Sequence, residues 1–297
     1  MSAIAPEMST MNWRTGFVLT EPADSLDIII NEVLFNPPPG GVDFVEIYNN
    51  SEKTIDLQNW ALMNSTKGVI TPDHYVLAPQ QFLAITSDGA LLKNHYPSME
   101  DNTWMQAVAF PGFNDDEGKI TLLDLHGKTM DFFQYSEEMH SPFLKDKEGI
   151  SLERIDYNGS SNASSNWQSA SESLGFATPG RQNSQHLSAA QGDDLVTVEP
   201  AVFDPGSAGT DNFTLIKCRF PDPGNMATIR IVDASGRMVK TIAQQQSVGT
   251  EEDFKWEGDS DTGTEVRIGP YIVYLEVYDP NGSRRIYRKR VVVAGRF

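Results

Sequence analysis

The chain has 297 residues, of which 39% are hydrophobic and 22% charged, a composition typical of folded rather than disordered protein. At ~100–200 residues per domain, this length predicts two domains. No apolar run approaches the ~20 residues of a membrane-spanning helix. The first residues lack the pattern of a secretory signal, so we expect this segment to begin inside a longer polypeptide. The single cysteine, Cys218, excludes disulfides within the chain and thiolate zinc sites.

The net charge of −18 lies almost entirely in the first two-thirds of the chain. Residues 1–194 contain 10 Lys and Arg against 27 Asp and Glu, whereas residues 195–297 contain 13 against 14. Because binding to a phosphate backbone depends on clustered Lys and Arg, nucleic acid is a poor candidate partner for the acidic part. The uneven charge also indicates two joined units with different surfaces.

The first 184 residues contain short runs in which β-branched and aromatic residues alternate with polar ones. Turn-forming residues separate the runs, and short helical turns are expected only at 88–96 and near Glu137. Residues 15–20 read as the last strand of an upstream domain, so 1–27 are interpreted as its remnant. The expected strands of the first unit are 28–35, 44–49, 82–86, 119–125, 129–135 and 149–156. Strands at this spacing predict a β-sandwich or barrel.

A polar segment then separates the first unit from a second one. Residues 184–194 contain one Leu as their only large apolar residue, which is typical of a linker, and we place the linker at 185–200. Hairpins are predicted at 227–243 and 271–293, with further strands near 213–220 and 254–256. About seven strands in ~100 residues match an immunoglobulin-like sandwich. The predicted fold class is therefore all-β, with two immunoglobulin-like sandwiches joined by a short polar linker and expected to be independent domains.

Several ordered motifs in residues 28–184 resemble the lamin tail domain. The opening reads Ile28-Ile-Ile-Asn-Glu-Val33, and Asp43-Phe-Val-Glu-Ile-Tyr-Asn49 follows it. Later elements agree with this resemblance, namely Asn59-Trp60, Gly149 to Arg154, Ser165-Asn-Trp167 and Ala177-Thr-Pro-Gly180. The resemblance implies a β-sandwich over residues 28–184.

The remainder, residues 201–297, resembles the immunoglobulin-like domain of the flagellar hook-capping protein. The motifs are Ile229-Arg-Ile231, Asp233 to Arg237, Trp256-Glu-Gly258 and Gly269-Pro-Tyr271. This pair of domains resembles the ends of large surface proteins of Bacteroidetes-type bacteria, which implies an extracellular or cell-surface location. The family's Ser-Pro-Asn-Gly-Asp-Gly loop is degraded here to Asp204-Pro-Gly-Ser-Ala-Gly209, so a calcium role is not carried over from it.

Two groups of carboxylates are weak candidates for Ca²⁺, which takes six to eight oxygen ligands. Glu32, Asp43 and Glu46 lie on or beside strands expected to be neighbours, and Asp259 and Asp261 form a partial Asp-x-Asp-x-Gly pattern. Neither matches a complete calcium loop. The alternatives are that Glu32 or Glu46 pairs with Arg154 or bonds loop amides, and that the second group is a solvated turn. We therefore expect no obligatory cofactor.

The run Arg284-Arg285-Ile-Tyr-Arg288-Lys289-Arg290 places five positive charges on one predicted strand. It is a weak candidate for docking an anionic partner. It also fits a solvated strand whose charges prevent edge-to-edge pairing, or a strand that faces the acidic first unit. Alternation predicts that Tyr287, Val291 and Val293 supply the core contacts.

No motif predicts an enzyme. The five histidines are scattered, and the chain has no His-Glu-x-x-His, Gly-x-Ser-x-Gly or phosphate-binding glycine loop. Four tryptophans, Trp60, Trp104, Trp167 and Trp256, are expected in cores or loop anchors rather than in a carbohydrate-stacking platform. The predicted function is a non-catalytic structural and interaction module that contacts a protein or cell-envelope component. The alternative is an accessory region of an extracellular hydrolase or nuclease whose catalytic domain lies upstream.

Overall fold

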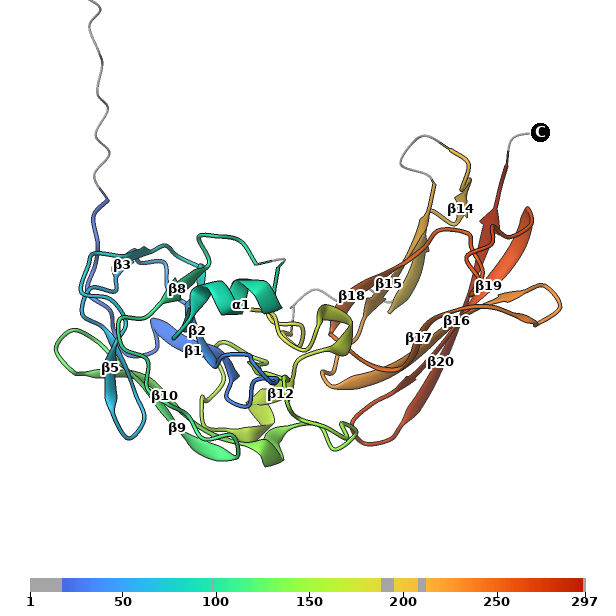
Figure 1. Cartoon of the computed structure of the whole chain (residues 1–297). Coiled ribbons are helices and arrows are strands. Elements are labelled where there is room, and N and C mark those ends of the chain that lie inside the picture. The colour runs from blue at the N-terminus through green and yellow to red at the C-terminus, as the bar shows by residue number, and fades with distance from the viewer. Residues whose placement is uncertain (1–17, 98, 188–194, 208–211, 296–297) are drawn as a thin grey trace, which may run out of the picture.

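The computed structural model describes residues 18–97, 99–187, 195–207 and 212–295. These residues form two β-sandwich units that lie side by side (Figure 1). The described helices are short, and none is long and apolar enough to cross a membrane. The predicted all-β class with two sandwiches is confirmed.

The first unit packs a six-stranded sheet against a four-stranded one. The six-stranded sheet has the order β12-β11-β1-β2-β7-β8, with β12 Trp167–Ser169, β11 Leu152–Arg154, β1 Ile28–Leu34, β2 Phe44–Asn49, β7 Phe82–Thr86 and β8 Trp104–Gln106. The four-stranded sheet has the order β10-β9-β4-β5, with β10 Thr129–Ser136, β9 Glu117–Leu123, β4 Ala61–Met63 and β5 Lys67–Val69. A small ladder pairs β3 Ile55–Asp56 with β6 Val76–Leu77.

Helical turns occur where the sequence predicts them. The helix α1, Gly89–His95, begins at Asp88, whose side chain accepts a hydrogen bond from the Leu91 amide. A 3-10 turn covers Glu137–Met139. Two more 3-10 turns, at Ser164–Asn166 and Glu172–Leu174, were not predicted.

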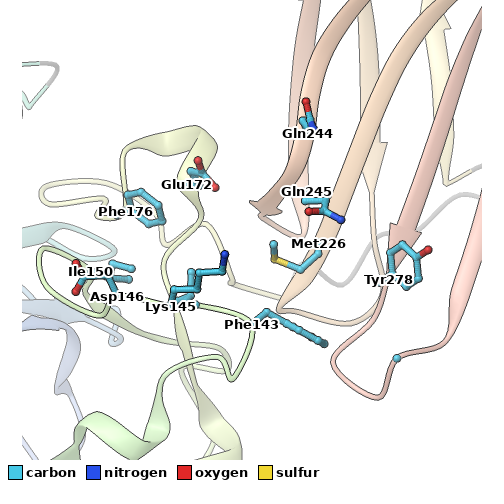
Figure 2. A pocket seen from close by; sticks show the side chains of 12 residues that line it. Phe143, Lys145, Asp146, Ile150, Glu172, Phe176, Met226, Gln244, Gln245 and Tyr278 are labelled. Atoms are coloured by element: carbon cyan, nitrogen blue, oxygen red, sulfur yellow. The ribbon is translucent and has the colours of Figure 1, made fainter.

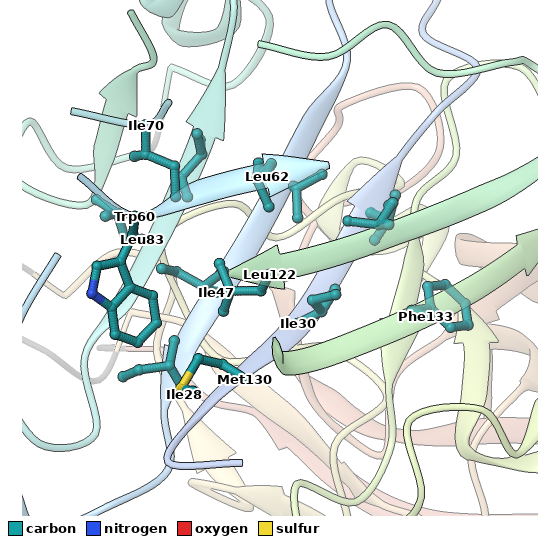
Figure 3. Close-up of a cluster of buried hydrophobic side chains, with 14 of the residues drawn as sticks. Ile28, Ile30, Ile47, Trp60, Leu62, Ile70, Leu83, Leu122, Met130 and Phe133 are labelled. Atoms are coloured by element: carbon teal, nitrogen blue, oxygen red, sulfur yellow. The ribbon is translucent and has the colours of Figure 1, made fainter. Parts of the chain in front are cut away.

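The hydrophobic core of the first unit lies between its two sheets. Figure 3 shows apolar side chains from β1, β2, β4, β7, β9 and β10 meeting there, with Trp60 at one end and Phe133 at the other. Phe133 stacks on Trp167 with ring centroids 3.7 Å apart. As predicted, Trp60 and Trp167 are core residues, with 2% and 3% of their surface exposed.

A β-bulge at Asn31 decides which side chains of β1 face this core. Before the bulge Ile28 and Ile30 point inward, and after it Val33 does so, because one extra residue shifts the alternation by one position. Glu32 therefore points to the opposite face of the sheet, where the neighbouring Leu34 packs under α1. The bulge thereby places Glu32 in the candidate site described below.

The second unit packs a three-stranded sheet against a five-stranded one. The first has the order β13-β15-β18, with β13 Val196–Glu199, β15 Thr214–Arg219 and β18 Glu251–Trp256. The second has the order β14-β20-β19-β16-β17, with β14 Val202–Phe203, β20 Arg284–Val293, β19 Gly269–Tyr278, β16 Asn225–Asp233 and β17 Met238–Val248. Trp256, fully buried, packs edge-on against Phe203 and Tyr271 at the centre. Both predicted hairpins, β16–β17 and β19–β20, are confirmed.

The boundaries differ from the predicted ones. The expected strand at 15–20 falls partly outside the described residues, and residues 18–20 carry no strand. Residues 21–27, expected to be a remnant of another domain, pack on the first unit, where the Leu26 amide bonds the Met130 carbonyl at 3.0 Å. The predicted linker 185–200 is too long at both ends, because Gln185 is fully buried and Val196 already belongs to β13.

Candidate functional site

Three fully buried glutamates form a row across the outer face of the six-stranded sheet. In the strand register Glu32 lies opposite Glu46 of β2 on one side and opposite Glu153 of β11 on the other. Each of the three is 0% exposed. Buried carboxylates are unfavourable unless they are hydrogen-bonded or neutral, so the row requires a specific covering layer.

That layer is the segment 177–187, which we call the strap. The Thr178 amide donates to Glu32 Oε1 at 2.8 Å, and the Gly180 amide donates to Glu46 Oε2. The Ser184 hydroxyl and the Gln185 amide donate to Glu153 Oε2 at 2.7 and 2.9 Å. The strap is therefore held to all three strands of the row by hydrogen bonds whose strength depends on whether the glutamate carboxyl groups are ionised.

The geometry also indicates where a proton lies. The Thr178 hydroxyl is 2.7 Å from Glu153 Oε1 and 3.2 Å from Glu32 Oε2. It has one proton and can donate fully to only one of them, so protonation of the other carboxyl group would satisfy both contacts. Burial, followed by repulsion from Glu153, raises the pKa of Glu32 to about 8. Burial likewise raises the pKa of Glu46 well above its ordinary range and raises that of Glu153.

The structure brings together two of the three carboxylates in the first predicted calcium group. Glu32 and Glu46 share the row, whereas Asp43 lies beside Asp115 and the Phe113 amide, and its burial raises its pKa to about 7. The carboxyl oxygens of the row accept hydrogen bonds from amides and hydroxyls. A calcium ion would instead need six to eight oxygens directed at one point. Among the described residues, no group of three or more His, Cys, Asp and Glu is arranged to hold a metal ion.

The alternative partner proposed for these glutamates, Arg154, faces the other way. Its Nη1 bonds Asp131 Oδ2 at 3.1 Å, and both side chains are almost fully buried. Arg154 points into the sandwich while its neighbour Glu153 points to the strap, because successive strand residues alternate. Pairing of Arg154 with Glu32 or Glu46 is therefore wrong. Bonding to loop amides, the other alternative, is what the structure shows.

The second carboxylate group fastens a loop to a strand. Asp261 Oδ1 accepts a hydrogen bond from the Thr241 amide at 2.8 Å, and Asp259 pairs with Lys240. Both contacts fall on β17, the edge strand of its sheet. Asp261 thus covers backbone groups of an edge strand, which restricts pairing with other chains, and Asp259 holds the Lys240 side chain of the same strand.

The basic run forms most of β20. As predicted, Val291 and Val293 are buried and Tyr287 packs against the core. Arg288 lies over the ring of Tyr274, 5.3 Å from its centroid, and Arg284 pairs with Glu276. Both partners belong to the adjacent strand β19, so these two arginines face their own sheet rather than the acidic first unit. Arg285 and Arg290 are exposed, and the structure places Lys289 on the core-facing side of the strand.

A groove of about 620 Å³ lies between the two units and was not foreseen from the sequence. Phe143 and Phe176 line it from the first unit, and Met226, Gln245 and Tyr278 line it from the second (Figure 2). Phe143 and Tyr278 expose 42% and 38% of their surface. The sequence did carry a signal for Tyr278 as a surface-binding residue, because alternation along the predicted strand 271–279 places this large aromatic side chain on the solvent-facing side. Phe143 lies in a loop outside any periodic segment and gave none.

Two residues of the groove have an unusual backbone. Phe176 and Gln245 have φ angles of +63° and +50°, in the left-handed region that side chains other than glycine rarely adopt. Such conformations persist where the surrounding structure fixes them and are concentrated at functional sites. Phe176 is fixed because its carbonyl accepts the Ser151 amide at 3.0 Å and its amide bonds the Ser171 carbonyl at 2.9 Å.

The strap also joins the two units. The Ser184 carbonyl accepts the Thr250 amide at 2.8 Å, and Gln185 Oε1 accepts the Gly224 amide at 2.8 Å. The His186 carbonyl accepts the Thr250 hydroxyl at 2.5 Å. The same short segment therefore bonds the buried glutamates on one side and the backbone of the second unit on the other.

Residues 21–137 match the family model described as Lamin Tail Domain, so the first unit carries a lamin tail domain. The matched range starts earlier and ends earlier than the predicted 28–184, although β11 and β12 complete the same sheet. No curated protein matches the chain.

Solved structures resemble the chain only distantly. The structure of CopC from Methylosinus trichosporium OB3b is 19% identical, and the match covers 34% of this chain and 92% of CopC with a TM-score of 0.24. Dimeric latent PorU from Porphyromonas gingivalis is 11% identical over 86% of this chain and 18% of PorU, with a TM-score of 0.27. PorZ, a surface component of the type-IX secretion system of the same organism, is 15% identical over 87% of this chain and 38% of PorZ, with a TM-score of 0.26. At these scores the likenesses carry no argument about function.

Proposed function

We propose that this chain is a non-catalytic structural and interaction module that holds two β-sandwich units in one fixed orientation. The observation that carries this proposal is the strap. Within it Ser184 and Gln185 are buried, and Ser184 bonds Glu153 through its side chain and Thr250 through its carbonyl. A connection made of buried hydrogen bonds on both sides resists bending, because opening it would leave polar groups unpaired.

The most enzyme-like contact in the described residues supports a non-catalytic role. His140 Nδ1 lies 2.9 Å from the Ser169 hydroxyl, but the two residues are only 5% and 1% exposed. The hydroxyl already accepts the Ser141 amide at 2.9 Å. A nucleophile must reach a substrate. His140 lines a cavity of about 660 Å³, but the Ser169 hydroxyl lies beneath the surface.

The location and the partner are part of the proposal. We propose that the module works outside the cell or on its surface, within a longer protein, and contacts a protein or cell-envelope component. Support for this comes from the resemblance of residues 201–297 to the immunoglobulin-like domain of the hook-capping protein. The lamin tail domain of the first unit is compatible with such a role, since its acidic surface disfavours nucleic acid.

Spin-label distance measurements test the fixed orientation. Labels are placed at Lys119→Cys on β9 and Lys255→Cys on β18, two exposed strand positions in different units. Cys218 is fully buried, and burial raises its pKa, so it does not take up the label. A single narrow distance distribution is expected. A broad distribution in the unaltered strap background would overturn the proposal.

The strap itself is tested by a matched pair of changes. Gln185→Ala combined with Thr250→Val removes the contacts of Gln185 with Gly224 and the hydroxyl bond to His186, so the distribution is expected to broaden. Gln134→Ala, a change of the same type at an exposed position of β10, is expected to leave it narrow.

A further inference from the structure

The outer face of the five-stranded sheet carries an unusual set of side chains. Tyr274 of β19 lies opposite Arg230 of β16 on one side and opposite Arg288 of β20 on the other. Arginine, aromatic and aliphatic residues continue to alternate over the rest of this face. On β16, β19 and β20 its members are Met226, Thr228, Arg230, Val232, Ile272, Tyr274, Glu276, Tyr278, Arg284, Ile286, Arg288 and Arg290.

The face is basic within an acidic protein. Its four arginines face a single carboxylate, Glu276, in a chain with a net charge of −18. Glu276 is itself occupied, because it pairs with Arg284 and accepts the Tyr278 hydroxyl at 2.7 Å. Arg230, Arg288 and Arg290 therefore present positive charge that no acidic residue of the same face balances.

One end of this face opens into the groove between the units. The register places Met226 opposite Tyr278, and Tyr278 opposite Arg284. Met226 and Tyr278 line the groove, and Figure 2 shows Phe143 extending from the first unit toward this side. The exposed rings of Phe143 and Tyr278 and the arginines of β20 thus belong to one continuous surface.

We propose that this surface binds an acidic polysaccharide, with sugar rings packed on the exposed rings of Tyr278 and Phe143 and carboxylates bound by the arginines. Binding in the groove depends on the fixed orientation of the units proposed above, because residues of both units line the groove. Arginine suits this ligand, since its planar guanidinium group binds a carboxylate through two parallel hydrogen bonds. Exposed aromatic rings beside a few polar groups are typical of ligand sites.

Charge density favours this ligand over nucleic acid. Duplex DNA carries one negative charge per ~1.7 Å and would extend from the face onto the acidic first unit. A polysaccharide with one carboxylate per sugar has a lower charge density and offers ring faces for Tyr278 and Phe143. A second copy of the chain would bring another net charge of −18 with it, so self-association through this face is disfavoured.

Binding of oligogalacturonate, which has one carboxylate per sugar, tests the proposal by calorimetry on the full chain. Arg288→Gln with Arg290→Gln is expected to weaken binding about tenfold or more, and so is high salt. Arg237→Gln with Arg267→Gln removes the same charge from exposed positions outside the face and is expected to change affinity less than about twofold. Neutral dextran is expected not to bind.

Phe143→Ala and Tyr278→Ala separate the groove from the sheet. Both are expected to weaken binding several-fold, while the spin-label distances stay unchanged. If the spin-label distances between the units prove broad, the orientation of the units is not fixed. Phe143→Ala should then have no effect on binding, while the Arg288 and Arg290 changes still weaken it. The two proposals can therefore fail independently of each other. The proposal is overturned by absence of oligogalacturonate binding, by equal binding in the Arg288 and Arg290 variant, or by tighter binding of single-stranded DNA. Salt-sensitive self-association that depends on the same arginines, without sugar binding, would assign the face to a second copy instead.

Discussion

Glu32 and Glu153 lie opposite each other on neighbouring antiparallel strands, and the hydroxyl of Thr178 lies between their carboxyl groups. One hydroxyl proton serves two carboxyls, and the pKa of Glu32, raised to about 8 by burial and by repulsion from Glu153, favours a second proton on this pair at neutral pH. Because Thr178 belongs to the strap, the protonation state of this pair is linked to the segment that joins the two units. The stability of the joint should therefore depend on pH.

Stability is expected to fall as pH rises from 6.5 to 8. The pKa of Glu32 is about 8 in the folded chain against an ordinary value of 4.5, so the folded state binds more protons than the unfolded state over this window. The slope reaches about 1.4 kcal/mol per pH unit for one proton, or about 2 kcal/mol over the window. The opposite effect of His140, whose burial lowers its pKa to about 4 from an ordinary 6.5, ends about one pH unit above 6.5 and offsets only about 0.4 kcal/mol of this decline. Chemical denaturation at several pH values measures this.

The Glu32→Gln variant is the control for that dependence. It keeps the size of the side chain and cannot ionise, so its unfolding free energy should decline less steeply between pH 6.5 and 8 than that of the wild type. Part of the decline remains because burial also raises the pKa values of Glu46 and Glu153. A weaker decline remains below pH 7 from Asp43, whose pKa of about 7 is also raised by burial. Parallel pH profiles for the variant and the wild type would show that Glu32 does not ionise in this range.

Replacement of Arg154 by Met is expected to be strongly destabilising. It leaves Asp131 buried without its charged partner and also removes the Nη2 bond to the Gly159 carbonyl at 2.6 Å. Breaking a buried pair by removing one member costs about 3–5 kcal/mol. In contrast, Lys255→Met breaks an exposed pair with Glu257 and should cost less than about 1 kcal/mol. Urea denaturation of the two variants compares them, and equal losses would be inconsistent with the buried geometry.

Gly68 of β5 is expected to tolerate no side chain. A Cβ atom there would lie 2.3 Å from the carbonyl oxygen of Ala109, a backbone atom of the segment that pairs with β5. Gly68→Ala should therefore destabilise the first unit by about 1–3 kcal/mol, the usual cost of overpacking. At Gly112 a Cβ meets nothing within 4 Å, so Gly112→Ala should be neutral or slightly stabilising. Similar melting temperatures for both variants would mean that the β5 edge can shift.

Calcium is expected not to stabilise the chain. The oxygens of Glu32 and Glu46 are engaged by the Thr178, Asn31 and Gly180 donors, which an ion would have to displace. Thermal melts in chelator and in millimolar calcium should coincide. A calcium-dependent rise of ~4 °C or more, about 1 kcal/mol for a ~100-residue domain, would reveal a bound ion.

The sequence alone predicted the longer strands and their grouping into two units. Alternation in segments such as 28–35 and 271–279 reflects burial of one face of a strand, which is a local property that a sequence records directly. The same property predicted that Val291 and Val293 face the core while arginines of the same strand stay in water.

Only the tertiary structure decided the partners of the charged residues. Glu32 and Glu153 are separated by more than 100 residues, and the sequence carries no signal that their strands pair. The bulge at Asn31 adds one residue and thereby turns Glu32 to the outer face, while Arg154 turns inward to Asp131.

The strap shows the same limit at the joint. The polar composition of residues 184–194 predicted a linker from residue 185 onward, yet Gln185 is fully buried because its side chain accepts the Gly224 amide and its backbone donates to Glu153. Polarity in a sequence indicates contact with polar groups, and whether these belong to water or to the protein depends on distant segments that meet only in the folded chain.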